Sequence, residues 1–306
     1  MERFQLLNGD VLVASFMHSR TLLGDVYSDI VVRKLDLLPI RLKSSCADTD
    51  IHNWITLRSI PENRRHRDAM LQALNIKVPF DLMSYSHALS LNDTFWIKKE
   101  DEDITFASIN LYDNKIDEGL GYIAFTGLLY NINADLSTPE LTTAGMLPKF
   151  WQRNKNDDII LCKGNTGGYT GIGYEPYREV AAHIIAGKLG VATIPYYLDE
   201  RHNKVVSISK LFTSKQIGLI TGSEYLDQKF PSVKTKHIKE LLSAMKDDKI
   251  NPCGFYEMCF LDYITENYDR HLNNWGFSVD NRTQQIIGFA LLLSGIMECR
   301  LTMTSL

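Results

Sequence analysis

The spacing of apolar and polar residues predicts a strand-rich middle section of the chain. Between residues 90 and 211, short runs rich in aliphatic and aromatic residues alternate with turn residues, which is typical of β-strands. One helix interrupts these runs, because apolar residues recur at helical spacing over Arg178–Leu189 and Gly190 supplies a stop. The five strand-like runs are DTFWIKK (93–99), ITFASINLY (104–112), DDIILCK (157–163), IPYYLD (194–199) and KVVSIS (204–209).

Beyond residue 211 the pattern becomes mainly helical. Apolar residues at helical spacing predict helices over Lys236–Lys246 and Phe255–Tyr268. A short hairpin follows, with strands at 275–279 and 286–290 around the turn DNRTQQ.

The first 90 residues show a weaker pattern, with a short strand over Val11–Phe16 and mixed loop and helix over Ile51–Leu74. The order of elements predicts an α+β fold with two lobes, since a doubly wound sheet would alternate strand and helix throughout. We place an N-terminal accessory segment at 1–90, a strand-rich N-lobe with one main helix at 91–211, and a helical, shortened C-lobe at 212–306.

Composition narrows the class of protein. The chain has 306 residues, of which 44% are hydrophobic, enough for a sizeable core. The net charge of -4 shows no basic excess, so we expect no direct nucleic-acid partner. The basic run Arg64–Arg67 is typical of a solvated surface, although it could also touch phosphate.

The cysteines and the apolar runs predict a cytoplasmic protein. Five cysteines without a C-x-x-C pair are typical of reduced thiols. No apolar run approaches the ~18–20 residues of a membrane span, and Asp10 interrupts the N-terminal apolar stretch, so we expect neither membrane nor signal peptide. Export by a route without such a signal stays open.

The sequence NYDRHLNNWG, at 267–276, carries the clearest chemical pattern. Asp269 and Asn274 stand five residues apart, which is the D-x-x-x-x-N spacing of a kinase catalytic loop. In such a loop the aspartate accepts the proton of an attacking hydroxyl. The asparagine offers a neutral oxygen to a magnesium ion on the nucleotide phosphates.

The order Asp-Arg-His in this loop inverts the usual H-R-D of kinases. The loop resembles the catalytic loop of the HipA-like kinases, including the CtkA-type enzymes, because it reads N-x-D-R-H-x-x-N followed by an aromatic residue and Gly. The resemblance covers about Ser90 to Ala290. It implies a bilobal kinase-like fold and an ATP-dependent serine/threonine protein kinase, with Asp269 as base and Asn274 holding Mg²⁺. Arg270 and His271 would brace the loop.

A second pattern concerns Lys163, at the end of the predicted strand 157–163. Alternation places Ile159, Leu161 and Lys163 on one face, so the lysine should lie in a cleft and pair with an anion. In the HipA-like kinases this lysine contacts the nucleotide phosphates and pairs with a helix glutamate. Glu179 is our candidate for that partner, and Glu175 is a nearby rival.

The segment TTAGMLPK, at 142–149, resembles the phosphate-covering loop of the family. Gly145 permits close approach of backbone to phosphate, and Thr142 and Thr143 could donate to phosphate oxygens. The resemblance also implies that either threonine could be autophosphorylated. The glycine-rich stretch Gly164–Gly173 follows the lysine instead of preceding it, so we expect it to be a connector.

The chain departs from the family after the hairpin. Family members carry there a strand that ends in a magnesium-binding aspartate, whereas this chain reads LLLSGIMECR after Ala290 and has no aspartate beyond Asp280. Glu298 is the one acid of this stretch, and nothing predicts it at the metal. We therefore expect a truncated or frameshifted C-lobe and slower phosphoryl transfer.

Three functions follow in order. The first is a serine/threonine kinase that uses ATP and Mg²⁺ on a protein substrate, with an antitoxin or another regulatory partner. The second is a pseudokinase that acts as a nucleotide-binding or protein-interaction module, which the missing aspartate favours. The third is a small-molecule or lipid kinase, which shares the fold and the metal ligands.

Overall fold

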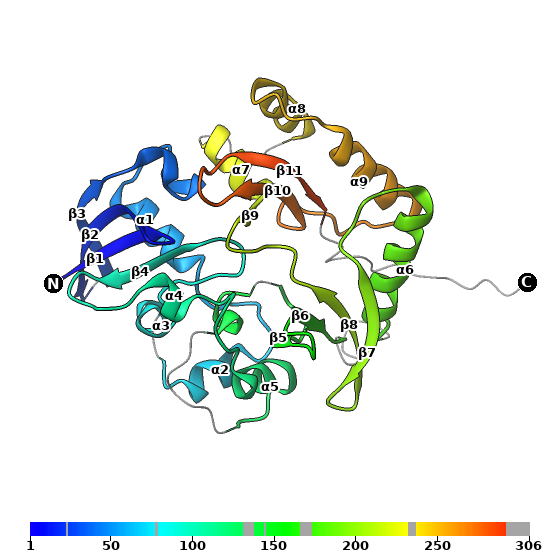
Figure 1. Ribbon diagram of the computed structural model, residues 1–306, viewed down its shortest axis with the longest axis horizontal. Coiled ribbons are helices and arrows are strands. Elements are labelled where there is room, and N and C mark those ends of the chain that lie inside the picture. Colours follow the sequence, from blue (N-terminus) through cyan, green and yellow to red (C-terminus); the bar gives the residue numbers. More distant parts are fainter. Residues whose placement is uncertain are drawn as a thin grey trace, which may run out of the picture.

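The computed structural model describes residues 1–22, 24–76, 79–130, 138–143, 145–165, 173–231 and 237–291. These residues form three antiparallel β-sheets with helices around them (Figure 1). The α+β class predicted from the sequence is confirmed. None of the helices in these residues has the length and apolar character that a membrane span requires.

The first sheet is built largely by the N-terminal segment, in the order β3-β2-β1-β4. Helix α1 packs on β3, and the core between them contains Trp54 and Phe16. Strand β4 pairs with β1 although it lies in the segment predicted as the N-lobe, so hydrogen bonds cross the expected boundary near residue 90. The elements are β1 (Glu2–Asn8), β2 (Val11–Thr21), β3 (Gly24–Val32), β4 (Phe95–Lys99), α1 (Asp48–Thr56), α2 (Arg67–Ala73) and α3 (Pro79–Ser86).

One predicted strand is wrong. The run 104–112 forms the short helix α4 (Phe106–Ile109) and a turn after it. Local hydrogen bonds explain the difference, since Ser108 Oγ accepts from the Thr105 N–H and Asn110 Oδ1 accepts from the Tyr112 N–H. Such side-chain caps compete with strand pairing and override the β-propensity of the aromatic and β-branched residues.

The second sheet has the order β5-β6-β8-β7, with one helix on each face. Phe125 of α5 packs with Cys162 in one hydrophobic cluster, whereas α6 meets the face that carries Lys163. Neighbouring strand residues point to opposite faces, so α6 and α5 cover different sides. The elements are α5 (Glu118–Thr126), β5 (Lys149–Arg153), β6 (Ile159–Lys163), α6 (Glu175–Leu189), β7 (Tyr196–Arg201) and β8 (Lys204–Lys210).

The third sheet, in the order β11-β10-β9, holds the predicted hairpin and is covered by helices. Gly276 lies against the Ile220 carbonyl, which is too close for any side chain. The predicted helices are confirmed with shifted ends. The elements are β9 (Ile217–Thr221), α7 (Gly222–Lys229), α8 (Ile238–Asp247), α9 (Cys253–Ile264), β10 (Trp275–Asp280) and β11 (Ile286–Leu291), and the short 3₁₀ turns are η1 (Leu35–Leu37), η2 (Ile40–Leu42) and η3 (Pro139–Leu141).

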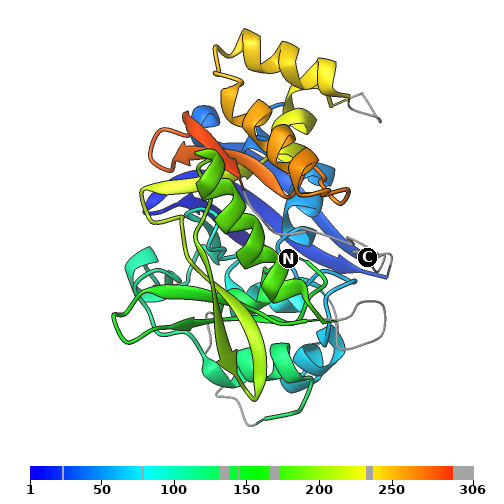
Figure 2. The same cartoon turned by 90° about the vertical axis from the view of Figure 1, so that its right-hand side faces the viewer.

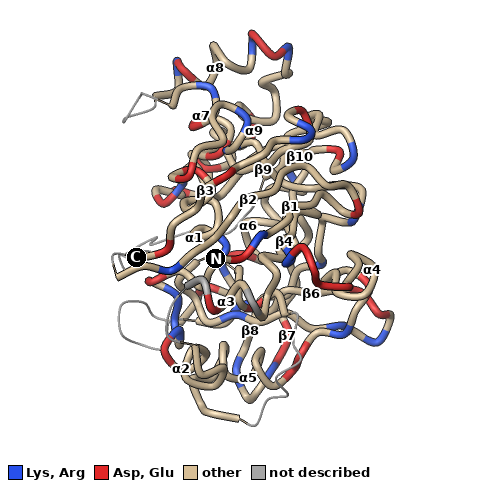
Figure 3. Tube along the Cα trace, turned by 90° about the vertical axis from the view of Figure 1, so that its left-hand side faces the viewer, with Lys and Arg blue, Asp and Glu red and all other residues tan. Residues whose placement is uncertain are grey.

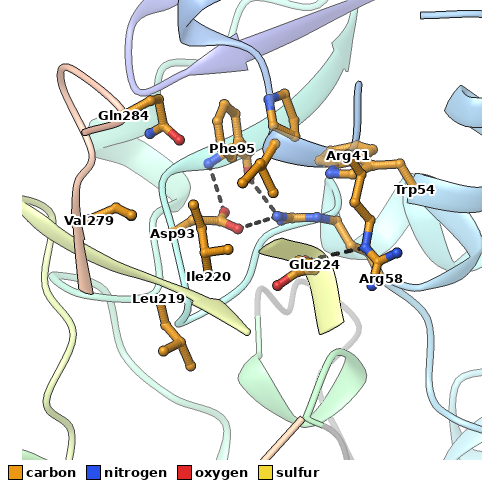
Figure 4. Close-up of a pocket in the computed structure, with 12 residues that line it drawn as sticks. Arg41, Trp54, Arg58, Asp93, Phe95, Leu219, Ile220, Glu224, Val279 and Gln284 are labelled. Atoms are coloured by element: carbon orange, nitrogen blue, oxygen red, sulfur yellow. Dashed lines mark hydrogen bonds and ion pairs between the residues drawn. The ribbon is translucent and has the colours of Figure 1, made fainter. Parts of the chain in front are cut away.

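Ion pairs join the N-terminal segment to the rest of the molecule. Arg58 lies 4.3 Å from the centre of the Trp54 ring and pairs with Asp93. Arg41 Nε lies 3.5 Å from Glu224 Oε1 on α7 (Figure 4). The pocket among these residues holds about 20 Å³, room for about one water molecule. It is therefore a junction between segments and too small for a nucleotide.

Candidate active site

Lys163 and Glu179 form a buried ion pair between β6 and α6. Lys163 Nζ lies 2.8 Å from Glu179 Oε1, and the two residues are 4% and 3% exposed. The structure thus chooses Glu179 over Glu175. The strand alternation predicts an anionic partner for Lys163, and the resemblance to the HipA-like kinases favours Glu179 over its rival Glu175.

Two hydroxyl groups complete the surroundings of this pair. Lys163 Nζ donates to Tyr196 Oη at 3.2 Å, and Ser207 Oγ donates to Glu179 Oε2. Burial by itself would lower the pKa of Lys163, but the Glu179 carboxylate and Tyr196 outweigh it and hold the pKa above the ordinary value. The lysine is therefore charged at neutral pH.

The loop predicted to cover phosphate begins at η3 and leads into β5. Thr142 Oγ1 donates to the Leu89 carbonyl at 3.1 Å, and Thr143 Oγ1 donates to the Pro139 carbonyl at 2.6 Å. Each hydroxyl has a single proton, so a contact with phosphate as donor would require either side chain to rotate. Gly145 has φ +96°, a conformation that glycine adopts without strain.

Arg64 anchors this loop from the N-terminal segment. Its Nη2 lies 3.0 Å from Glu140 Oε2, and its Nη1 donates to the Thr143 carbonyl at 2.8 Å. Both side chains of the Arg64–Glu140 pair are 0% exposed. The expectation of a solvated surface is therefore wrong for Arg64. The turn that the Arg64 N–H closes on the Pro61 carbonyl lies just before α2, and no periodic pattern in the sequence indicates it.

The surface outside this cluster is mixed in charge. Lysine, arginine, aspartate and glutamate positions are interspersed along the trace in Figure 3, and a run of four acids follows β4 at residues 100–103. Arg64 and Lys163, in contrast, are both buried.

The loop between α9 and β10 is built on Asp262 of α9. Arg270 forms two hydrogen bonds with the Asp262 carboxylate, each 2.8 Å long, and a third with the Asn274 carbonyl at 2.9 Å. Asn267 Nδ2 also donates to Asp262, and Asn267 Oδ1 accepts from the Asp269 N–H. Arg270 therefore braces the loop, as the resemblance to the HipA-like kinases implies.

The two residues at the ends of the D-x-x-x-x-N pattern differ in exposure. Asp269 is exposed, whereas Asn274 is 7% exposed. Asn274 Nδ2 donates to the Asp269 carbonyl at 3.3 Å, and this bond does not use the amide oxygen. An exposed carboxylate can accept a proton from an incoming hydroxyl, and an amide oxygen is a ligand that Mg²⁺ accepts.

Helix α6 connects the two parts of the site. Glu179 reaches Lys163, while Ala182 and Ala186 pack in the hydrophobic cluster that includes Leu261 of α9. In Figure 2, α6 stands between β7 and β8 below and α9 with the hairpin above. In the described part of the chain no hydrogen bond or ion pair joins Lys163 or Glu179 to Asp269 or Asn274. Helix α6 and Tyr196 of β7, which lies in the same cluster, connect the two parts through packing.

No family model matches the chain. A stretch of 109 residues is 30% identical to the serine/threonine-protein kinase CtkA of Helicobacter pylori strain J99 and covers 32% of each protein. A crystal structure of the H. pylori proinflammatory kinase CtkA matches 51% of this chain and 57% of that chain, at 21% identity and a TM-score of 0.46. A chain of the Shewanella oneidensis MR-1 complex of HipA, HipB and operator DNA matches 96% of this chain and 75% of its own, at 13% identity and a TM-score of 0.59.

Over about a third of its length the chain is similar in sequence to the kinase CtkA, and its fold is similar to that of the chain from the HipA complex. The resemblance inferred from the loop 267–276 is thereby confirmed, and the fold is kinase-like. The match spans about a third of the length of the curated relative. At 13% identity, the likeness to the chain of the HipA complex concerns the fold.

The departure from the HipA-like pattern begins where β11 ends, at Leu291. The predicted loss of the second metal-binding aspartate falls on residues 292–306, outside the described residues, and so does part of the glycine-rich stretch 164–173. The described residues hold no group of three or more His, Cys, Asp or Glu side chains placed for a metal ion.

Proposed function

We propose that this protein is a kinase that transfers the γ-phosphoryl group of ATP to a serine or threonine hydroxyl of a protein. The observation that carries the proposal is the buried ion pair between Lys163 of β6 and Glu179 of α6. Helix α6 also packs against α9, and α9 leads into the loop of Asp269 and Asn274. A buried lysine and glutamate in this order along the chain, followed by D-x-x-x-x-N, is a set of residues that kinases use in phosphoryl transfer, here without the second metal-binding aspartate.

The reaction assigns one role to each side chain. Lys163, oriented by Glu179, binds oxygens of the phosphates. The substrate hydroxyl oxygen forms a bond to the γ-phosphorus, the bond from that phosphorus to the bridging oxygen breaks, and ADP leaves with the electron pair. The hydroxyl proton passes to the Asp269 carboxylate and then to solvent. Mg²⁺, held by Asn274 and the phosphates, would supply neutralisation of phosphate charge.

A second candidate is a nucleotide-binding module without phosphoryl transfer. The sequence favours it, because positions 291–296 read Leu-Leu-Leu-Ser-Gly-Ile where the HipA-like pattern has an aspartate. A missing carboxylate at a metal site removes electrostatic stabilisation of the transition state, which is commonly the largest contribution to the rate. Nucleotide would then bind without turnover.

Intact mass after incubation with ATP and Mg²⁺ tests the proposal. The parent protein is expected to gain phosphoryl groups, or to pass them to a mixture of generic protein substrates, and Asp269→Asn to gain none. Asp101→Asn, which changes an exposed acid in the turn after β4, is the matched control and should behave as the parent. Nucleotide binding without any phosphoryl gain would refute the transfer step and support the second candidate.

A further inference from the structure

The side chain of Tyr196 lies on the face of the second sheet that carries Lys163. Lys163 is the register partner of Ser207, and Tyr196 is the register partner of Ser209, both on β8. Ser207 and Ser209 are two residues apart, so they point to the same face, and their partners point with them. Tyr196 is 4% exposed, and it packs in the hydrophobic cluster of α6 and α9. The fold therefore holds its ring in place beside the lysine.

The ammonium group of Lys163 has three protons, and the protein binds two of them. Glu179 Oε1 accepts one hydrogen bond at 2.8 Å, and Tyr196 Oη accepts another at 3.2 Å. Lys163 Nζ also lies 4.9 Å from the centre of the Tyr196 ring. Within the residues that the structure describes, Lys163 Nζ donates no third hydrogen bond. One N–H is therefore left for a ligand.

The two acceptors contribute in different ways. The Glu179 carboxylate balances the charge of the lysine, whereas the Tyr196 hydroxyl is neutral. Burial raises the pKa of Tyr196 further above neutral pH, and Lys163 opposes this only in part. A neutral hydroxyl accepts a hydrogen bond without adding a negative charge, which would repel a phosphate. Tyr196 thus supplies direction rather than charge.

The direction follows from the tetrahedral shape of an ammonium group. When one N–H is fixed on Glu179, the other two can still rotate about that bond. A second fixed N–H, on Tyr196, removes the rotation and leaves the third N–H with a single direction. Ordering a long side chain before the ligand arrives removes part of the entropic cost of binding. The two acceptors together therefore preorganise the lysine for one phosphate oxygen.

We propose that Tyr196 is a positioning residue, which turns the Lys163 ammonium so that its third N–H meets a phosphate oxygen of the nucleotide. The inference rests on the proposed function and adds to it a residue of β7 that lies outside the kinase-like motifs of the sequence. Tyr196 acts through Lys163, so it neither contacts the nucleotide nor exchanges a proton in the reaction.

Calorimetric titration of the full chain with Mg²⁺–ADP and with adenosine tests this role, because only ADP carries phosphates. The parent protein is expected to bind both. Tyr196→Phe keeps the ring and removes the acceptor, so it should bind Mg²⁺–ADP roughly threefold to tenfold more weakly and adenosine with unchanged affinity. Tyr197→Phe is the matched control, since Tyr197 is 59% exposed and points to the opposite face, and it should bind both ligands as the parent does.

A double-mutant cycle shows whether Tyr196 acts through Lys163. In the Lys163→Met background, Tyr196→Phe should weaken Mg²⁺–ADP binding no further, because no ammonium is left to turn. The double variant also replaces both partners of the hydrogen bond by apolar side chains, which leaves no unpaired polar group at that contact. Its comparison with Lys163→Met therefore serves if a thermal unfolding scan shows that Tyr196→Phe alone does not fold.

Unchanged affinity of Tyr196→Phe for Mg²⁺–ADP would overturn the inference and leave the proposed function standing. Equal weakening of Mg²⁺–ADP and adenosine binding would overturn it too, because Tyr196 would then shape the site without aiming the lysine at phosphate. A further loss of Mg²⁺–ADP affinity on adding Tyr196→Phe to Lys163→Met would likewise contradict it. Absence of Mg²⁺–ADP binding in the parent would overturn the proposed function as well.

Discussion

The Lys163–Glu179 pair allows a direct test of the geometry that carries the proposed function, independent of any enzymatic activity. The perturbation is a double-mutant cycle with Lys163→Met, Glu179→Leu and the double variant. Methionine and leucine have similar volume to the residues they replace, so the cycle removes charge while the packing changes little.

The magnitudes follow from the contacts. Glu179→Leu leaves Lys163 buried with Tyr196 as its remaining hydrogen-bond partner, and breaking a buried pair in this way costs about 3–5 kcal/mol. Lys163→Met leaves Glu179 buried with the Ser207 hydroxyl as a remaining partner, and we expect a cost of about 3 kcal/mol. The double variant loses only two hydroxyl contacts, about 2 kcal/mol in total.

Urea denaturation followed by tryptophan fluorescence measures each free energy of unfolding, with an unchanged m-value as the condition for comparison. The double variant should be at least about 2 kcal/mol more stable than the sum of the single effects predicts. Lys99→Met, which breaks the exposed pair between Lys99 and Glu2, is the control and should cost less than about 1 kcal/mol. If the changes in the free energy of unfolding of the two single variants simply add in the double variant, the reasoning is refuted. The buried pair of Lys163 and Glu179 would then be coupled no more strongly than the exposed pair of Lys99 and Glu2.

Three further predictions test other parts of the structure. Arg64→Met leaves Glu140 buried without its ion-pair partner and should lower the free energy of unfolding by about 3–5 kcal/mol, measured by urea denaturation; a change below about 1 kcal/mol would mean that Arg64 is solvated after all. Gly276→Ala places a carbon against the Ile220 carbonyl and should prevent pairing of β10 with β9, seen as loss of soluble folded protein by circular dichroism, whereas Gly288→Ala, where nothing lies within 4 Å, should fold. Folding lowers the pKa of Lys149, so the unfolded chain binds more protons than the folded one. The free energy of unfolding of the parent, relative to that of Lys149→Met, should therefore rise with pH between the lowered pKa and about 10.4, by at most about 1.4 kcal/mol per pH unit. If this difference in the free energy of unfolding does not change with pH over that range, the lowered pKa is contradicted.

Several elements of the fold could be predicted because their determinants are local. The alternation in DDIILCK placed Lys163 on an inward face, and the helical spacing after Arg178 gave α6 to within a few residues. The spacing of Asp269 and Asn274 and the hairpin after them are likewise set by short stretches of chain. Period, turn residues and motif spacing are all properties that neighbouring residues determine together.

The tertiary structure decided what depends on distant partners. It chose Glu179 over Glu175, because one helical turn separates them and the packing of α6 on the second sheet sets which one meets Lys163. It placed β4 beside β1, from which some 90 residues separate it along the chain, and it turned the 104–112 run into a capped helix.

Arg64 shows most plainly what the sequence by itself does not determine. Within the run of basic residues it has the same composition signal as its neighbours, yet its side chain is fully buried against Glu140, 76 residues further along the chain. Charge patterning reports how a segment prefers water, whereas burial of a charge depends on whether the fold brings it a partner. The sequence determined the chemistry available to this protein, and the packing of the N-terminal segment under the loop determined which cations surround the site.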